Sequence, residues 1–298
     1  MADIRYISSR VVADKAGFEF FAEFYNGILG SQETDVYVNF DQCKEFDANL
    51  AAVLGAILDC MTENGRRMYV SNPKERGVRR ALSRNKFLKA FDVQTRNEDR
   101  ENFIVYRKFG TDEPLAFKSF INSDLIRKQR FPHCTPRAAE KIIESIYEIF
   151  ANAASHGKCR YIYCCGEVHS RSGKSMMDMT FVNLGTTVVE NVNTYLQTRY
   201  GKQLGACETL RWAFVKGNTT KPIPGGLGLD ILKEFIGMNE GTIQMVSGNA
   251  MLEIENNTVT GTLLDRFFPG TIVNVEFNCS DQKAYLLPDE QIDLNNLL

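Results

Sequence analysis

The chain has 298 residues, of which 44% are hydrophobic and 24% are charged, and its formal net charge at pH 7 is -2. This composition is typical of a globular protein with a hydrophobic core, built as one large domain or two ordinary ones. The balanced charge gives no support for nucleic acid or an anionic membrane as the main partner, and no apolar run reaches the length of a membrane span.

The cysteines and the N-terminal segment indicate a reducing compartment. The eight cysteines are scattered and include no C-x-x-C pair, so the sequence predicts neither a zinc site nor a disulfide framework. Cys164 and Cys165 are adjacent, and in a strand they would point to opposite faces. The N-terminal segment lacks the apolar core of a signal peptide. We therefore expect free thiols in a cytoplasmic protein.

Residues 1–95 are predicted to form a small α/β domain. After an aromatic-rich helix over 16–28, hydrophobic spacing predicts strands and helices in alternation, over 35–40, 46–61, 67–70 and 76–91. This order predicts a largely parallel sheet. Residues 96–134 are expected to be a connector that contains a short strand at 103–106 and a helix over 114–128.

The N-terminal unit resembles a STAS-type domain, the small α/β module of anti-sigma factor antagonists. The resemblance lies in the strand-to-helix order and in the segment Phe46-Asp47-Ala48-Asn49-Leu50. Phosphorylated members of that family have a serine near the start of this helix, whereas Ala48 and Asn49 offer no hydroxyl here. The resemblance implies a docking or structural module rather than a phosphoacceptor. An unrelated small α/β domain is the alternative.

One long helix is predicted from Pro136 to His156, at the start of an α+β domain over 135–279. Thr135 is a suitable N-cap, Pro136 suits the first helical position, and Gly157 stands where helices commonly end. Isoleucine and phenylalanine side chains recur at helical spacing and form one apolar stripe. Glu148, Asn152 and His156 are spaced by four residues, so they stack along a neighbouring stripe. On spacing alone, this second row would be a solvent-facing boundary of the helix.

The rest of this domain is predicted to alternate between strands and helices. Strands are expected over 160–168, 176–183, 241–247, 251–255 and 271–277, with a hairpin turn at 170–173 and helices over 191–216 and 229–236. Helices on one face of an antiparallel or mixed sheet give an α+β layer. Residues 280–298 are expected to be a polar, partly loose tail.

Three short segments carry residues suited to a nucleotide. A glycine-rich turn at 225–228 leads into a helix, where backbone N–H groups favour an anion, and Thr219 and Thr220 precede it. Asn183 ends a strand, and its amide can form two hydrogen bonds with adenine. Thr271 opens the last strand. Each segment also has an ordinary interpretation, as a turn or an Asx turn.

Taken in order over about residues 136–278, these segments resemble the GHKL superfamily of ATP-binding domains. This superfamily includes type II topoisomerase ATPases, 90-kDa heat-shock chaperones, mismatch-repair ATPases and histidine kinases. The resemblance implies a Bergerat-type fold, a two-layer sandwich of helices on a mixed, mainly antiparallel sheet. The closest branch is that of the anti-sigma factor kinases, whose N-box also has a histidine shortly after the asparagine, as His156 follows Asn152 here.

The resemblance implies a role for each matching residue. Asn152 would coordinate Mg²⁺, and Glu148 would polarise the attacking water. Asn183-Leu184-Gly185 matches the adenine-binding box, and Gly270-Thr271 matches the pair beside the adenine. The remaining positions, including the glycine box over the phosphates, are expected to contact the nucleotide: His156, Thr219, Thr220, Gly226, Leu227, Gly228 and Leu229.

Two positions depart from the family pattern. The adenine-binding aspartate of the family is Asn183 here, and its second glycine is Thr187. An asparagine still offers both a donor and an acceptor, so we expect adenine binding to survive, weaker or with an altered base preference. No phosphoacceptor helix of the histidine-kinase kind is evident. His133 and His169 are interpreted as ordinary surface or turn residues.

The sequence thus predicts an ATP- and Mg²⁺-dependent protein of the cytoplasm. It would hydrolyse ATP slowly, or use its nucleotide state to switch a regulatory protein partner. One alternative is a protein-serine kinase of the anti-sigma factor type that acts on another chain. The other is an adenine-nucleotide sensor without catalysis. The sequence does not identify the protein partner. A homodimer is also consistent with the sequence.

Overall fold

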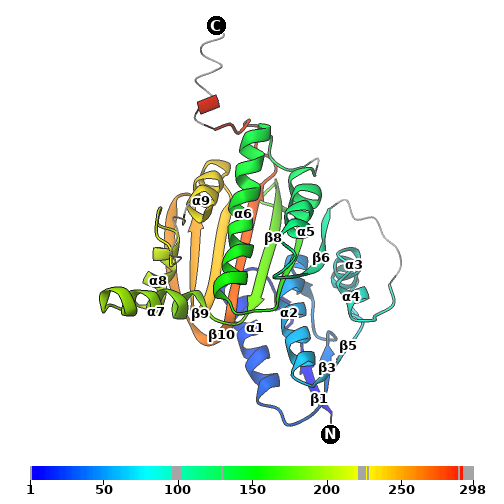
Figure 1. Ribbon diagram of the computed structural model, residues 1–298. Coiled ribbons are helices and arrows are strands. Elements are labelled where there is room, and N and C mark those ends of the chain that lie inside the picture. The colour runs from blue at the N-terminus through cyan, green and yellow to red at the C-terminus, as the bar shows by residue number, and fades with distance from the viewer. Residues whose placement is uncertain are drawn as a thin grey trace.

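A five-stranded antiparallel sheet forms the middle of the molecule, with helices on one face and the N-terminal unit on the other (Figure 1). The computed structural model describes residues 2–95, 102–128, 130–220, 226, 228–287 and 289–290. The expected combination of a parallel N-terminal α/β unit and a C-terminal antiparallel sheet with helices is confirmed.

The central sheet has the strand order β6-β7-β8-β10-β9. Its strands are β6 (Phe103–Gly110), β7 (Tyr161–Arg171), β8 (Lys174–Leu184), β9 (Thr242–Glu255) and β10 (Thr258–Asn278). The edge strand β6 comes from the segment that was expected to be a connector.

The β9–β10 hairpin is longer than the sequence predicted. Two separate strands over 241–247 and 251–255 were expected, but β9 is one strand, in which Gly248 has a positive φ of 64°. Residues 258–270, which were not predicted as strand, extend β10. Asn256 and Asn257 both have positive φ, as a two-residue hairpin turn requires. The alternation of side chains in 258–270 is too irregular to have shown this extension.

Helices α5 (Pro114–Phe120), α6 (Pro136–His156) and α9 (Gly228–Asn239) cover one face of this sheet. The prediction for α6 is confirmed to its ends: Thr135 Oγ1 accepts a hydrogen bond from the Ala138 N–H, and Gly157 is the C-cap. The single helix predicted over 191–216 is wrong. Gly201, with φ 65°, ends α7 (Val188–Tyr200), and α8 (Ala206–Ala213) begins after Gly205.

The N-terminal unit contains a parallel sheet of β1 (Asp3–Tyr6), β3 (Asp35–Asn39) and β5 (Arg67–Val70). A second small sheet pairs β2 (Arg10–Val11) with β4 (Glu45–Phe46). The helices are α1 (Lys15–Leu29), the 3₁₀ turn η1 (Ala48–Leu50), α2 (Ala51–Glu63), α3 (Arg76–Arg84) and α4 (Phe87–Ala90). The helix expected over 76–91 is divided at Lys86, whose φ is 66°.

The N-terminal unit shares one hydrophobic core with the back of the central sheet. Val182 on β8, Ile272 on β10 and Cys165 on β7 pack with α1 and α2, whereas Cys164 and Phe181 pack with α5, α6 and α9. The opposite orientation of the two adjacent cysteines is confirmed. The sheet is therefore covered on both faces, and the N-terminal unit forms a third layer beyond the two that the sequence predicted.

The cysteines are free thiols, as predicted. Burial raises the pKa of the Cys43, Cys134 and Cys159 thiols to about 11, so these side chains stay protonated at neutral pH.

Polar side chains join the N-terminal unit to the sheet; this contact is called the polar seam below. The buried Asn49 Nδ2 donates hydrogen bonds to Thr180 Oγ1 and Asn274 Oδ1, each at 3.0 Å. The neighbouring Ala48 N–H donates to Glu167 Oε1 at 2.6 Å. Ala48 and Asn49 are thus buried against the sheet.

A row of acidic residues lies beside the polar seam. Glu167, Asp178 and Glu276 are cross-strand neighbours on β7, β8 and β10. Burial raises the pKa of Glu167 to about 8, and it also raises the pKa of Glu276. His169 was predicted to be a surface or turn residue: its side chain is partly exposed, but it lies within β7 rather than in a turn. Its contact with Asp178 raises its pKa to about 9.

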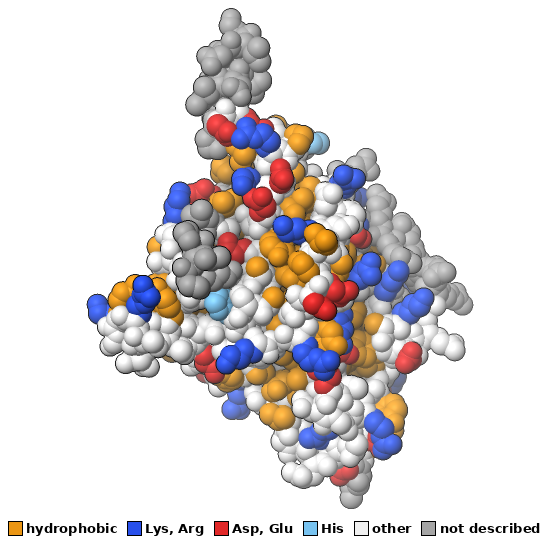
Figure 2. Space-filling model, viewed as in Figure 1, with side chains coloured by type: hydrophobic (Ala, Val, Ile, Leu, Met, Phe, Trp, Pro, Cys, Tyr) orange, Lys and Arg blue, Asp and Glu red, His pale blue; other side chains and the backbone are white. Residues whose placement is uncertain are grey.

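The segment after β10 is held against the domain as far as the structure describes it. Tyr285 is buried beside Phe235, and its backbone pairs with that of Cys134. On the helix-covered face, acidic and basic side chains are scattered around hydrophobic ones without a patch of a single sign (Figure 2). None of the described helices has the length and apolar character to cross a membrane.

Replacing Asn49 by alanine is expected to lower the free energy of unfolding by roughly 1–3 kcal/mol, because it removes two buried hydrogen bonds and leaves a small cavity. Asn49 Oδ1 has no hydrogen-bond partner among the described residues, which keeps the cost moderate. Urea unfolding measures it. The matched control is Asn64→Ala at the exposed end of α2, which should change stability by less than about 0.5 kcal/mol. If Asn49→Ala and Asn64→Ala changed the free energy of unfolding equally, the polar seam would not be a stabilising contact.

Candidate functional site

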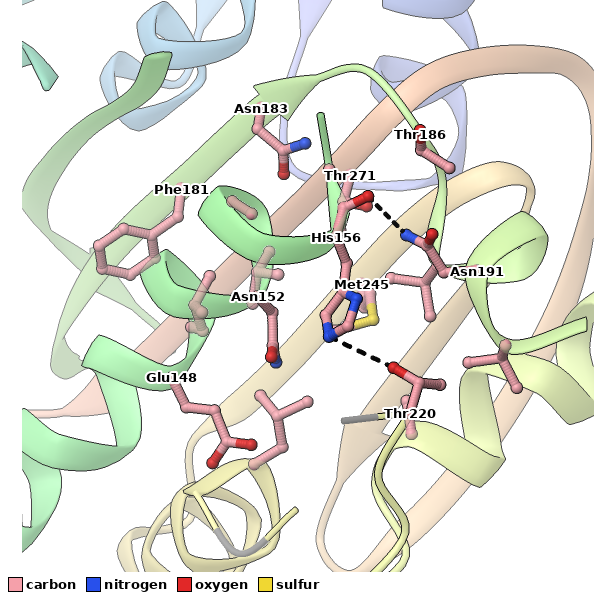
Figure 3. Close-up of a pocket in the computed structure, with 18 of the residues that line it drawn as sticks. Glu148, Asn152, His156, Phe181, Asn183, Thr186, Asn191, Thr220, Met245 and Thr271 are labelled. Atoms are coloured by element: carbon pink, nitrogen blue, oxygen red, sulfur yellow. Dashed lines mark hydrogen bonds between the residues drawn. The ribbon is translucent and has the colours of Figure 1, made fainter. Parts of the chain in front are cut away.

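One pocket on the helix-covered side contains most of the residues that the sequence singled out (Figure 3). It lies among α6, α7, the end of α8, the start of α9 and the ends of β8 and β10. Its volume is about 900 Å³, counting the part that is open to solvent. A concave pocket that combines an apolar lining with a few polar groups is typical of a site for a small molecule or cofactor.

Helix α6 supplies one wall of the pocket. Glu148, Asn152 and His156 all line it, and their side chains project from successive turns of the helix into the same space (Figure 3). The apolar stripe of α6 packs on the sheet, so the row spaced by four residues is held beside the cavity. The solvent-facing interpretation of this row is therefore wrong.

His156 is tied to two other elements of the pocket. Its Nε2 lies 3.3 Å from Thr220 Oγ1, and its carbonyl accepts a hydrogen bond from Asn191 Nδ2 at 3.0 Å. Thr219 also lines the pocket. The end of α6 is thus held between α7 and the loop before α9.

The end of the pocket beside Gly157 contains a buried amide whose N–H has no hydrogen-bond partner among the described residues. Asn183 and Thr271 are cross-strand neighbours on β8 and β10, and both line the pocket. Thr271 Oγ1 is hydrogen-bonded to Ser247 Oγ at 2.8 Å. Asn183 is only 6% exposed, and its Nδ2 has no hydrogen-bond partner among the described residues. A buried N–H without a partner costs free energy, so this position favours a ligand that accepts a hydrogen bond.

The floor of the pocket is apolar. Side chains of β7, β8, β9 and β10 line it, namely Ile162, Phe181, Met245 and Val273. A flat apolar ligand part would lose its contact with water there, whereas the polar groups at the edges would determine its orientation.

The start of α9 faces Glu148. The Gly228 N–H donates a hydrogen bond of 2.5 Å to Glu148 Oε2, and a β-carbon at Gly228 would lie 2.1 Å from the same oxygen. Gly226 and Leu229 line the pocket, whereas Gly228 is placed beside it through this contact. The N-terminal end of a helix attracts an anion, and in this structure the Glu148 carboxylate occupies that position.

Gly185 fixes the end of β8 against the end of α6. Its φ is 148°, and a β-carbon there would lie 2.0 Å from the Gly157 carbonyl oxygen. The next N–H, of Thr186, donates to the same oxygen at 2.7 Å. Gly185 does not line the pocket itself, but it permits the approach that places Asn183 beside α6. Leu227 lies outside the described residues.

Several residues of the pocket were missed by sequence reasoning, among them two asparagines and the tryptophan. Asn191, Trp212 and Asn218 line it, and the Asn218 Nδ2 donates to the Trp212 carbonyl at 2.9 Å. These residues fall in or next to the region predicted as one continuous helix, so their positions could not be related to the pocket. The capping box of Thr187 and Glu190 is the sequence signal that would have placed the start of α7 at Val188, ahead of the predicted helix.

No protein-family model matches the chain, and no curated protein sequence matches it either. The pocket's own geometry and the residues that line it therefore carry the functional argument.

Replacing Gly185 by alanine is expected to lower the free energy of unfolding by about 2 kcal/mol or more, because the new methyl group would overlap the Gly157 carbonyl and the backbone conformation is strained for alanine. Thermal unfolding measures this. The control is Gly77→Ala in α3, where a β-carbon meets no atom within 4 Å and alanine favours the helix. A Gly185→Ala variant as stable as the Gly77→Ala variant would contradict the close approach of α6 and β8.

Proposed function

We propose that this chain binds a Mg²⁺–adenine nucleotide in the pocket and uses it for slow hydrolysis or for switching a regulatory protein partner. The observation that carries the proposal is the buried Asn183 amide, whose Nδ2 has no hydrogen-bond partner among the described residues. It lies in a pocket with an apolar floor, which is also bordered by Asn152 on α6 and by the start of α9. The five-stranded antiparallel sheet with helices on one face agrees with the GHKL-type fold that the sequence resembles.

The adenine would lie on the apolar floor beside Asn183 and Thr271. An amide offers one acceptor and two donor hydrogens, and adenine presents both an amino group and ring nitrogens. Ile162, Met245 and Val273 line the same space and would cover the faces of a flat ring. The pairing would satisfy the Asn183 N–H, and this gain supports a purine over a ligand without hydrogen-bonding groups.

The phosphates would lie between α6 and the start of α9. The α9 N-terminus favours negative charge, and Thr219, Thr220 and His156 add hydroxyl and imidazole groups at this end of the pocket. Asn152, one turn from both Glu148 and His156, would hold Mg²⁺ through its side-chain oxygen. The metal, when bound, neutralises charge on the phosphates.

Glu148 is placed for a role at the terminal phosphate, but it must first leave Gly228. In this structure its carboxylate accepts the Gly228 N–H, the same group that a phosphate oxygen would use. Nucleotide binding would therefore displace Glu148 from the α9 N-terminus and leave it free to orient a water molecule. This replacement of Glu148 by a phosphate oxygen at the Gly228 N–H supports hydrolysis or switching over a sensor that only binds the nucleotide.

Isothermal titration with Mg²⁺–ATP tests the binding proposal. Asn183→Leu keeps the approximate size of the side chain but removes its hydrogen bonds, and it should weaken ATP and ADP binding at least tenfold, the loss of about one buried hydrogen bond. Asn64→Leu, on the exposed end of α2, should bind as the wild type does. A wild-type protein that binds no adenine nucleotide would overturn the proposal.

A second prediction concerns Glu148→Gln, which keeps an oxygen for the Gly228 N–H but removes the charge. We expect ATP hydrolysis to fall about 100-fold, as for loss of a general base, while nucleotide affinity stays equal or rises because a carboxylate no longer opposes the phosphates. A steady-state phosphate-release assay and a titration measure the two quantities. Unchanged turnover would exclude this role for Glu148.

The same samples separate the alternatives. Transfer of labelled phosphate to another protein, without free turnover, would support the serine kinase. Tight nucleotide binding with neither reaction would support the sensor.

A further inference from the structure

A second cluster of chemically active side chains lies on the opposite face of the central sheet from the pocket. His169 on β7, Asp178 on β8 and Glu276 on β10 come from three adjacent strands. Asp178 and Glu276 are direct cross-strand neighbours, and each is only 6% exposed. The proposed nucleotide function uses none of the three.

The three side chains converge on one point. Their ligand-type atoms all lie within 4.8 Å of one another. His169 Nε2 lies 2.9 Å from Asp178 Oδ2 and 3.7 Å from Glu276 Oε2. Ligand atoms at about 2.0–2.2 Å from a tetrahedral zinc ion are roughly 3.3–3.6 Å apart, so small side-chain shifts would complete a coordination shell.

The hydrogen bonding of the cluster is incomplete without a further group. His169 Nε2 is buried and has no hydrogen-bond partner among the described residues, although it lies in ion-pair contact 2.9 Å from Asp178 Oδ2. Asp178, although nine-tenths buried, has no described partner other than His169. A cation bound between the carboxylate and the ring nitrogen would give both buried groups a partner.

Glu276 is already oriented for such a role. Its Oε1 accepts hydrogen bonds from Arg171 at 2.9 Å and from Thr242 at 3.4 Å, whereas its Oε2 faces His169. Ligating carboxylates are commonly held in this way by outer partners on their second oxygen.

We infer that His169, Asp178 and Glu276 bind a divalent transition-metal ion of the Zn²⁺ class, with water completing its coordination. An imidazole and two carboxylates suit zinc, whereas Mg²⁺ prefers oxygen ligands alone. The ion would join three strands of the sheet beside the N-terminal unit and offset the negative charge of the two ligating carboxylates. The His169 side chain is 31% exposed, so the cluster lies near the surface of the protein.

Titration of the metal-free full chain with Zn²⁺, without nucleotide, tests the inference. We expect about one ion per chain to be lost in both His169→Gln and Asp178→Asn, which remove one ligand each at nearly constant size. His133→Gln replaces an exposed histidine and is the matched control, expected to keep the full stoichiometry. Equal zinc stoichiometry in all four proteins, or none in the wild type, would overturn the inference.

Two further measurements guard against binding at thiols and against misfolding. Co²⁺ in the site should show visible d–d bands without the intense thiolate charge-transfer absorption that ligation by any of the eight cysteines would give. Zn²⁺ should raise the unfolding temperature of the wild type and of His133→Gln by several degrees, but not that of His169→Gln or Asp178→Asn. Thiolate absorption in the Co²⁺-loaded wild type would overturn the assignment. If Asp178→Asn fails to fold, the zinc stoichiometry and unfolding temperature of His169→Gln test the inference without it.

Discussion

The contact between the end of α6 and the end of β8 is the constraint on which the rest of the site depends. Gly157 and Gly185 face each other with no room for a β-carbon at Gly185, and the Thr186 N–H donates to the Gly157 carbonyl. This close approach places Asn183, which is near the C-terminal end of β8, beside the helix that carries Asn152 and His156. A larger side chain at either glycine would separate the polar row of α6 from the strand ends and open the pocket between them.

Local sequence signals correctly predicted those helices and strands whose limits are set by residues within the element itself. The caps at Thr135 and Gly157, with the apolar stripe between them, were sufficient to define α6 to its ends. The same kind of signal failed where structure depends on a single backbone conformation. Lys86 and Gly201 adopt positive φ and divide predicted helices, and the turn at Asn256 and Asn257 pairs β9 with residues that have little strand character of their own. Tertiary pairing decides such segments.

The sequence singled out many residues of the pocket one by one, but it did not show that they meet in one place. A row of Glu148, Asn152 and His156 can be explained as the solvent-facing boundary of one helix. Asn183 can be explained as an Asx turn at the end of a strand. Neither spacing nor composition reveals that Asn183 Nδ2 would be buried with no hydrogen-bond partner in the described part of the chain, because that depends on two distant segments meeting. The contact between Glu148 and Gly228 was equally hidden, since 80 positions separate the two residues in the chain. The acidic row escaped notice for the same reason: its members are neighbours only after three strands pair.

The two faces of β8 and β10 link the pocket to the N-terminal unit. Along β8, Phe181 and Asn183 face the helices and the pocket, whereas Asp178 and Thr180 face the polar seam. Along β10, Thr271 lies at the pocket and Asn274 in the seam. Because side chains alternate with a period of two, a slip of one residue would move every one of them to the wrong face. The buried hydrogen bonds of Asn49 with both strands therefore hold the same register that pairs Asn183 with Thr271, and the N-terminal unit contributes to the geometry of a pocket that it does not touch.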